Sequence, residues 1–277
     1  MHCGVIHVAR GAGYRDLALA SARSLREQGD GLENDIFTDM PVPAGADFAL
    51  VHPIPQTATR DKIACMAASR FERTLFLDCD TLVVQPLGDL FDLLDRFDLA
   101  VAHDVRRLSP LIRAGHAVQT PYAFPQFNTG VVLYRRSPAM AEFLAEWGRR
   151  HAAAGLNRDQ PTFRDLLWQS DLRFHVLPPE FNLRRVTLMD AWEPLDARPT
   201  IIHSHRLLQH LRGEPERVTD VARLMELERA ALAEEWQALG LPARPAPGAD
   251  PVARHARAEA GGGPAAGPVS ASRRSRP

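Results

Sequence analysis

Residues 73–82 read RTLFLDCDTL, an apolar run that ends in two aspartates at positions 78 and 80. The run predicts a strand, residues 73–77, that delivers both carboxylates to one edge of a sheet. Two carboxylates at one strand end repel each other unless a cation lies between them. Oxygen ligands of this kind suit Mg²⁺ or Mn²⁺, bound together with water and substrate phosphates. The alternative is a pair of solvated aspartates, one of which caps the next turn.

Outward from this stretch, strand and helix patterns alternate along the chain. Strands are predicted at residues 3–9, 35–38, 48–51, 73–77, 99–102, 130–134, 174–177 and 200–203. Helices are predicted at residues 14–28, 59–69, 88–94, 138–150, 159–169 and 219–239, with residues 105–125 irregular. This alternation predicts an α/β fold with a doubly wound, mostly parallel sheet, whose ligand site lies beyond the carboxyl ends of the strands. Asp39, Asp104 and His203 also follow predicted strands, so we expect them near the aspartate pair.

Composition narrows the class of protein. The chain has 277 residues, 45% hydrophobic and 24% charged, with a net charge of -1, which excludes a strongly basic nucleic-acid-binding protein. No apolar stretch approaches the length of a membrane-spanning helix, and residues 3–9 read as a first strand rather than a signal peptide. Three cysteines give no disulfide framework, so a cytoplasmic location is expected. Lys62 is the single lysine among 33 basic residues, which indicates either a functional ammonium or a chance surface residue.

The C-terminal segment differs from the rest. Residues 241–277 are rich in Pro, Gly and Ala and carry a charge of +4, so we expect a disordered tail after a single domain spanning residues 1–240. That charge is compatible with weak contact to an anionic membrane surface, and equally with a solubilising tail that has no partner.

Two other enzyme classes share parts of these patterns. Phosphatases of the haloacid dehalogenase type also place Asp-x-Asp after a strand, but with a threonine where this chain has Leu82, and with a later lysine that this chain lacks. Nicotinamide enzymes carry G-x-G-x-x-G, which residues 11–16 begin to match, but Asp16 replaces the third glycine and would repel a pyrophosphate. The two glycines are better explained by a tight turn near a nucleotide.

Three motifs in order resemble one enzyme family. FERTLFLDCDTLVVQPLGDLFDLL (71–94), FNTGVVLYRRSP (127–138) and RDQPTF (158–163) are similar to the nucleotide-diphospho-sugar transferases related to glycosyltransferase family 8, over most of residues 1–210. The resemblance implies a GT-A (Rossmann-like) fold and a metal-dependent glycosyltransferase. Such an enzyme moves a sugar from a nucleotide diphosphate, expected to be UDP, to a hydroxyl of a glycan, lipid or protein acceptor, with retention of anomeric configuration. No nucleic-acid partner is expected.

The resemblance also implies roles for individual residues. Mn²⁺ or Mg²⁺ would be held by Asp78, Asp80 and His203. Contacts to the donor would come from Ala9, Gly11, Tyr14, Asp39, Lys62, Asp78, Asp104, Asn128 and Gly130. The catalytic pair near the anomeric carbon would be Asp159 and Gln160, although Asp159 also suits a helix N-cap. For His203 the alternative is a strand histidine with no ligand.

One segment departs from the family pattern. The chain has Gln209 where the family places a lysine that holds the leaving phosphate, so Arg206 or His205 is expected to supply that charge. This departure keeps open a second class of function, a non-catalytic protein of the same fold that binds a glycan or a partner.

Overall fold

The computed structural model describes residues 2–56 and 60–240, so the predicted tail lies outside the described residues. The chain divides into two compact units, Met1–Leu224 and Met225–Pro277, and all the predicted site residues belong to the first. No helix of the described part is long and apolar enough to cross a membrane.

A seven-stranded sheet forms the centre of the first unit, in the order β3-β2-β1-β4-β7-β6-β8. Its strands are β1 (Cys3–Ala9), β2 (Glu33–Thr38), β3 (Leu50–His52), β4 (Arg73–Leu77), β6 (Leu99–His103), β7 (Phe127–Arg135) and β8 (Phe174–Leu177). All neighbours are parallel except β7, which runs antiparallel to both β4 and β6. The predicted α/β fold with a mostly parallel sheet is therefore confirmed.

The reversed strand β7 determines where the site lies. Leu77 at the end of β4 pairs with Val131, and His103 at the end of β6 pairs with Phe127. The first residues of β7, 128–130, therefore meet the carboxyl ends of two strands that run the other way. The Asp78 N–H donates to the Gly130 carbonyl at 2.7 Å, which ties the residue after β4 to this point.

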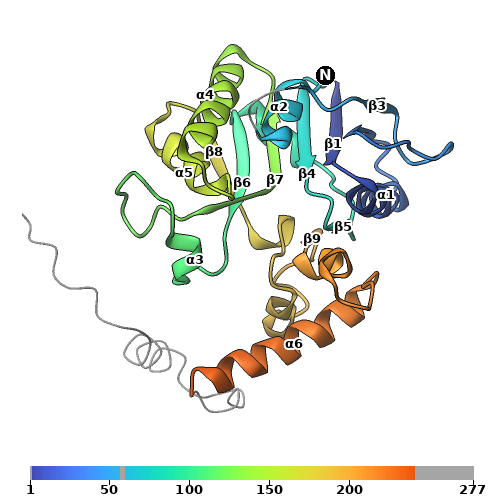
Figure 1. The fold of residues 1–277 in the computed structure, drawn as a ribbon, viewed down its shortest axis with the longest axis vertical. Coiled ribbons are helices and arrows are strands. Elements are labelled where there is room, and N and C mark those ends of the chain that lie inside the picture. The colour runs from blue at the N-terminus through green and yellow to red at the C-terminus, as the bar shows by residue number, and fades with distance from the viewer. Residues whose placement is uncertain (1, 57–59, 241–277) are drawn as a thin grey trace, which may run out of the picture. The chain divides into compact units, whose positions relative to one another are not determined.

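Helices cover both faces of the sheet. Figure 1 shows α4 and α5 beside β6 and β8, and α1 at the opposite end of the sheet near β1. The helices of this unit are α1 (Ala12–Glu27), α2 (Asp61–Ala67), α3 (Pro110–Arg113), α4 (Pro138–Ala154) and α5 (Gln160–Gln169), and α6 (Val221–Ala238) crosses the boundary between the units. The predicted start of α4 is confirmed, because Ser137 Oγ accepts from the Met140 N–H at 3.1 Å and Pro138 opens the helix.

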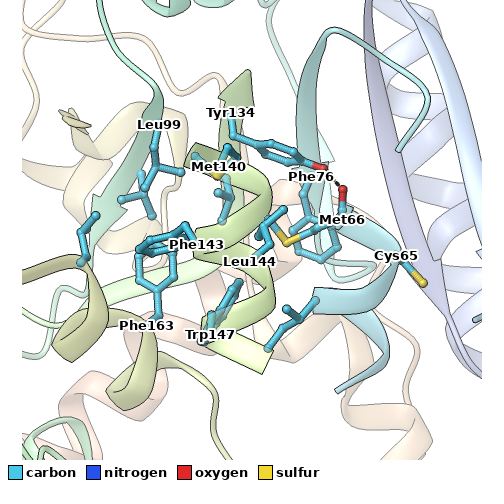
Figure 2. Close-up of a cluster of buried hydrophobic side chains, with 14 of the residues drawn as sticks. Cys65, Met66, Phe76, Leu99, Tyr134, Met140, Phe143, Leu144, Trp147 and Phe163 are labelled. Carbon is cyan, nitrogen blue, oxygen red and sulfur yellow. Dashed lines mark hydrogen bonds between the residues drawn. The ribbon is translucent and has the colours of Figure 1, made fainter. Parts of the chain in front are cut away.

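Side chains alternate between the two faces of the sheet. Figure 2 shows the cluster under α2, α4 and α5, where Phe143 and Trp147 both pack edge-on against Phe163 with ring centroids 5.6 and 4.9 Å apart. Tyr134 Oη donates to the Met66 carbonyl at 2.7 Å and joins β7 to α2. This buried aromatic packing holds β4, β6 and β7 in position, and the ends of these strands carry predicted site residues.

The opposite face carries a small second sheet that the sequence patterns did not predict. It consists of β5 (Thr81–Val83) and β9 (Ile201–His203), which pair antiparallel with Thr81 opposite His203. The described residues also form four 3₁₀ helices: η1 (Leu90–Asp95), η2 (Pro179–Phe181), η3 (Val186–Ala191) and η4 (His205–Arg212). The helix predicted at residues 88–94 is the 3₁₀ helix η1, and the strand predicted at 48–51 is the shorter β3.

Candidate functional site

A cavity of about 790 Å³ opens at the carboxyl edge of the sheet. Eight of the predicted site residues line it: Tyr14, Lys62, Asp78, Asp80, Asp104, Asn128, Gln160 and His203. They come from α1, α2, α5, β7, β9 and the segments after β4 and β6. Of the strand-end residues expected near the aspartate pair, Asp104 and His203 line the cavity and Asp39 does not.

Asp78, Asp80 and His203 form a compact group of potential ligands. One oxygen or nitrogen atom from each lies within 4.8 Å of the others. His203 Nε2 is 3.4 Å from Asp80 Oδ1 and 3.7 Å from Asp78 Oδ2. The pairing of β5 with β9 produces this arrangement, because it places His203 opposite Thr81, the residue after Asp80.

The other ring nitrogen of His203 is held by an amide. Asn182 donates through Nδ2 to Asn128 Oδ1 at 3.2 Å, so its Oδ1 accepts from His203 Nδ1 at 2.9 Å. Because Nδ1 donates to Asn182, Nε2 is the ring nitrogen that faces the two carboxylates and that can offer a lone pair to a metal ion bound between them. This is the arrangement of a metal-ligating histidine whose second nitrogen is oriented by a partner.

Gly130 makes the close approach of these groups feasible. A Cβ at this position would lie 2.0 Å from His203 Cε1 and 2.7 Å from Asp78 Oδ2. The family resemblance placed Gly130 among the donor contacts; in the structure the groups that lie against it are His203 and Asp78. Gly130 lies behind the cavity wall rather than in it.

The two carboxylates differ in acidity. Burial raises the pKa of Asp78 above its ordinary value, in spite of the nearby Lys62 and His203. Burial also acts against ionised Asp80, but the facing His203 and the nearby Arg184 outweigh it, so the pKa of Asp80 is lowered. Asp80 is thus held as a carboxylate, and a divalent cation beside Asp78 would favour its ionised form too.

Lys62 belongs to a buried ionic group. Its ammonium lies 3.1 Å from Asp159 Oδ2 and 3.9 Å from Asp78 Oδ1, and it donates to Thr129 Oγ1 at 2.9 Å. Arg60 Nε is 2.7 Å from the same Asp159 oxygen. Burial alone would raise the pKa of Asp159, but Lys62, Arg60 and the Thr129 hydroxyl hold it below its ordinary value. The single lysine is therefore not a chance surface residue.

The predicted catalytic pair separates in the structure. The Asp159 carboxylate faces Lys62, Arg60 and Thr129 and does not line the cavity, and it makes no side-chain capping hydrogen bond to α5. Gln160 does line the cavity, and its Oε1 accepts from Arg158 Nε at 3.0 Å. Of the two, only Gln160 is placed to touch a bound molecule.

Several other predicted donor contacts stand back from the cavity wall. Ala9 is fully buried in β1, and the Gly11 N–H donates to Asp39 Oδ1 at 2.7 Å. Arg206 does not line the cavity, whereas its neighbour His205 does. The residues behind the lining are Ala9, Gly11, Asp39, Gly130, Asp159 and Arg206.

The cavity contains cationic residues that sequence reasoning missed. Arg184 and Arg212 line it, and Arg184 Nη1 donates to the His203 carbonyl at 3.0 Å. In all, six arginine or lysine side chains and four aspartates line the cavity. No local pattern distinguishes Arg184 or Arg212 from the other arginines of the chain. The one signal that could have found them is that both lie within about 20 positions of His203 in the sequence. The excess of positive charge suits an anionic ligand.

Comparison with known proteins agrees with this geometry. A search of curated proteins finds no match. Among solved structures, the fold is similar to the glycosyltransferase GlyE of Streptococcus pneumoniae TIGR4 (17% identity, TM-score 0.53, covering 88% of this chain and 66% of GlyE). It is also similar to the galactosyltransferase LgtC, solved with donor and acceptor sugar analogues (14% identity, TM-score 0.56, covering 85% of this chain and 99% of LgtC). A third is mouse xyloside xylosyltransferase 1 (14% identity, TM-score 0.50, covering 73% of this chain and 97% of that chain).

These similarities establish the GT-A fold. The chain spans just under two thirds of the length of GlyE. Residues 72–208 match the family model described as nucleotide-diphospho-sugar transferase. The matched segment includes Asp78, Asp80 and His203. By this match, together with its fold, the chain resembles the nucleotide-diphospho-sugar transferases over residues 72–208.

Proposed function

We propose that the protein is a metal-dependent glycosyltransferase that moves a sugar from a UDP-sugar to an acceptor hydroxyl with retention of configuration. One observation carries the proposal above all: Asp78, Asp80 and His203 converge at a cavity with an excess of cationic side chains. A site built to hold a divalent cation and a diphosphate explains both features.

The donor set fits Mn²⁺ or Mg²⁺. Two carboxylates and an imidazole with its lone pair directed at them are a mixed oxygen and nitrogen set that Mn²⁺ accepts readily. When bound, the ion would neutralise charge that develops on the leaving diphosphate, which is worth several kcal/mol to such reactions.

The cationic residues of the cavity replace the missing family lysine. Arg184, Arg212 and His205 line the same cavity as His203, and the proposal gives them the binding of the diphosphate. Arg206, the sequence-based candidate, lies outside the lining, so the proposal assigns this role to Arg212 and His205. Guanidinium groups bind phosphate oxygens in bidentate fashion and hold the leaving group in place.

Three residues would orient the donor sugar and the reacting atoms. Asp104 and Asn128 line the cavity beside Asp78, and the Asn128 Oδ1 is occupied by Asn182 and by the Gly130 N–H. The Asn128 Nδ2 is thus left to donate to a sugar hydroxyl. Because Gln160 lines the cavity, the proposal assigns it to the position near the anomeric carbon, with Asp159 as a positioning residue that holds Lys62. Tyr14, also in the lining, is the candidate for contact with the nucleoside.

A screen of nucleotide sugars tests the proposal. UDP-, GDP- and other nucleotide sugars are incubated with the full chain and Mn²⁺, and release of free nucleotide is measured. We expect release from a UDP-sugar, its loss in EDTA, and its loss in Asp80→Asn, because that variant removes a ligand charge without changing size. Asp171→Asn, an exposed aspartate after α5, is the matched control and should behave as wild type.

Two results would contradict the proposal. Nucleotide release that persists in both EDTA and Asp80→Asn would remove the metal from the mechanism. Binding of UDP and Mn²⁺ without turnover of any nucleotide sugar would instead favour a non-catalytic protein of the same fold.

A further inference from the structure

A second cavity, of about 460 Å³, lies between the segment after β6 and helix α5. Its cationic side chains are Arg107, Arg113 and Arg164, and no described aspartate or glutamate lines it. Arg113 forms no ion pair or side-chain hydrogen bond with any residue that the structure describes. The volume of this second cavity is in the range of small-molecule sites.

The walls of this cavity present hydrogen-bond donors that lack acceptors. Arg164 and Gln126 are 5% and 3% exposed, yet Arg164 Nε and Gln126 Nε2 have no hydrogen-bond partner among the described residues, and the same holds for Arg107 Nε. The Gln126 amide is oriented because its Oε1 lies 2.6 Å from His116 Nε2. Buried donors without acceptors are costly, so an acceptor-rich ligand would recover that free energy.

The donors are held in place before any ligand arrives. Arg164 Nη1 donates to Asp165 Oδ1 at 2.7 Å, and Asp165 Oδ2 accepts from the Ala117 N–H at 2.6 Å. The Arg107 guanidinium stacks over the Tyr122 ring, 4.3 Å from its centroid. A site whose charged groups are already ordered loses less entropy on binding.

This cavity adjoins the proposed donor site. Ile112 of α3 lines both cavities, so the two cavities meet at this one-turn helix. Arg158 donates to the Leu111 carbonyl of α3 and, through Nε, to Gln160 Oε1. Arg158 therefore links α3, where the two cavities meet, to Gln160, the side chain proposed to lie near the anomeric carbon.

We propose that this second cavity binds the acceptor and that the acceptor is an acidic sugar, whose carboxylate or phosphate group is held by Arg107, Arg113 and Arg164. The inference rests on the proposed transferase function, because it names the molecule that would receive the sugar and would approach the donor site from the side of α3. An anion is favoured over a neutral sugar because the unpartnered wall groups are donors and the lining carries no negative charge.

A matched set of ligands tests this on the full chain. Glucose, glucuronate and glucose 6-phosphate differ at one carbon and supply a neutral group, a carboxylate and a phosphate. Their Kd values are measured by ligand-observed NMR titration. We expect the better acidic sugar to bind at least about tenfold more tightly than glucose, since hydrogen bonds to charged groups are the stronger ones. The tighter of the two anions identifies the acid.

Two variants and a control locate the site. Arg113→Gln and Arg107→Gln should each weaken binding of the preferred anion about tenfold. Arg113 is exposed in a short helix, so that variant does not endanger folding. Arg96→Gln removes the same charge from an exposed position after η1 and should change nothing. Equal binding of glucose and both anions, or unchanged affinity in both cavity variants, would overturn the inference.

A competition arm separates this inference from the transferase proposal. In wild-type protein saturated with UDP and Mn²⁺, the acidic sugar should still bind, because the cavities are distinct. Displacement by UDP and Mn²⁺ would place the anion in the donor cavity and overturn the inference alone. Failure of UDP and Mn²⁺ to bind at all would overturn the transferase proposal and the acceptor role with it.

Discussion

Replacing Gly130 with alanine should damage the metal site without altering any ligand. The new Cβ would lie 2.0 Å from His203 Cε1. Since carbon atoms in contact are about 3.5 Å apart, the imidazole must retreat by about 1.5 Å or β7 must bend. Neither is easy, because Asn182 holds His203 Nδ1 at 2.9 Å and the Gly130 carbonyl holds the Asp78 N–H at 2.7 Å.

The expected consequences follow from that displacement. Overpacking should cost about 1–3 kcal/mol of stability. A disturbed ligand environment should raise the Kd for Mn²⁺ by about 10–100-fold. The assay is titration with Mn²⁺ in the presence of UDP, with free Mn²⁺ measured by electron paramagnetic resonance, alongside urea unfolding.

Two further variants make the result specific. Val131→Ala, at the next and fully buried position of β7, should destabilise the protein while leaving Mn²⁺ affinity unchanged. Because His203→Ala removes the nearer of the two obstructing side chains, adding Gly130→Ala to it should cost less stability than adding it to wild type. Wild-type Mn²⁺ affinity in Gly130→Ala would refute the reasoning, since β7 would then tolerate the methyl group with His203 in place.

Three other predictions concern buried polar groups. Burial lowers the pKa of His7 to about 4 from 6.5, against its hydrogen bond with Asn34. Because the unfolded chain binds this proton more readily, the stabilisation from neutral His7 is fully present above pH 6.5, and the free energy of unfolding should fall by about 3 kcal/mol on acidification to pH 4. Urea unfolding of His7→Gln across this pH range should lack this decrease, and an equal decrease in the variant would contradict the assignment. Lys62→Met should cost about 3 kcal/mol in urea unfolding, because it leaves Asp159 short of a partner; the loss should shrink in an Asp159→Asn background, and a loss of equal size in both would argue against the pair. Asn182→Ala should raise the Kd for Mn²⁺ by about tenfold or more by freeing the His203 ring; unchanged affinity in a titration would show that the amide does not orient it.

The sequence predicted strands best where a continuous apolar run is buried on both faces. β1 and β4 begin and end where their sequence patterns predict, and so does β8, although most of its residues are only partly buried. β7 begins three residues before its predicted start, because the polar residues Asn128 and Thr129 interrupt the apolar pattern. Its apolar run reads the same in either direction. Its antiparallel orientation, which brings Asn128 to Asp78, depends on tertiary packing and not on local pattern.

The sequence predicted those site residues that lie at the ends of strands. Asp78, Asp80 and Asp104 follow strands, His203 is the last residue of β9, and all four line the cavity. The pairing of β5 with β9 could not be read, because three-residue strands carry no periodic signal.

The cationic wall of the cavity could not be read for a related reason. Arg184 and Arg212 lie in irregular and 3₁₀ segments, where spacing does not predict which way a side chain points. Family resemblance placed the lost phosphate charge at Arg206 or His205, and the structure places His205 in the lining.

Pulsed electron paramagnetic resonance of the protein with Mn²⁺ and UDP tests the central claim most directly. Echo modulation from a coordinated imidazole nitrogen should appear together with phosphorus coupling from the diphosphate. The nitrogen signal should vanish in His203→Gln while the phosphorus signal weakens. Phosphorus coupling without any nitrogen signal in the wild type would remove His203 from the metal site, and absence of both signals would contradict the account of this cavity.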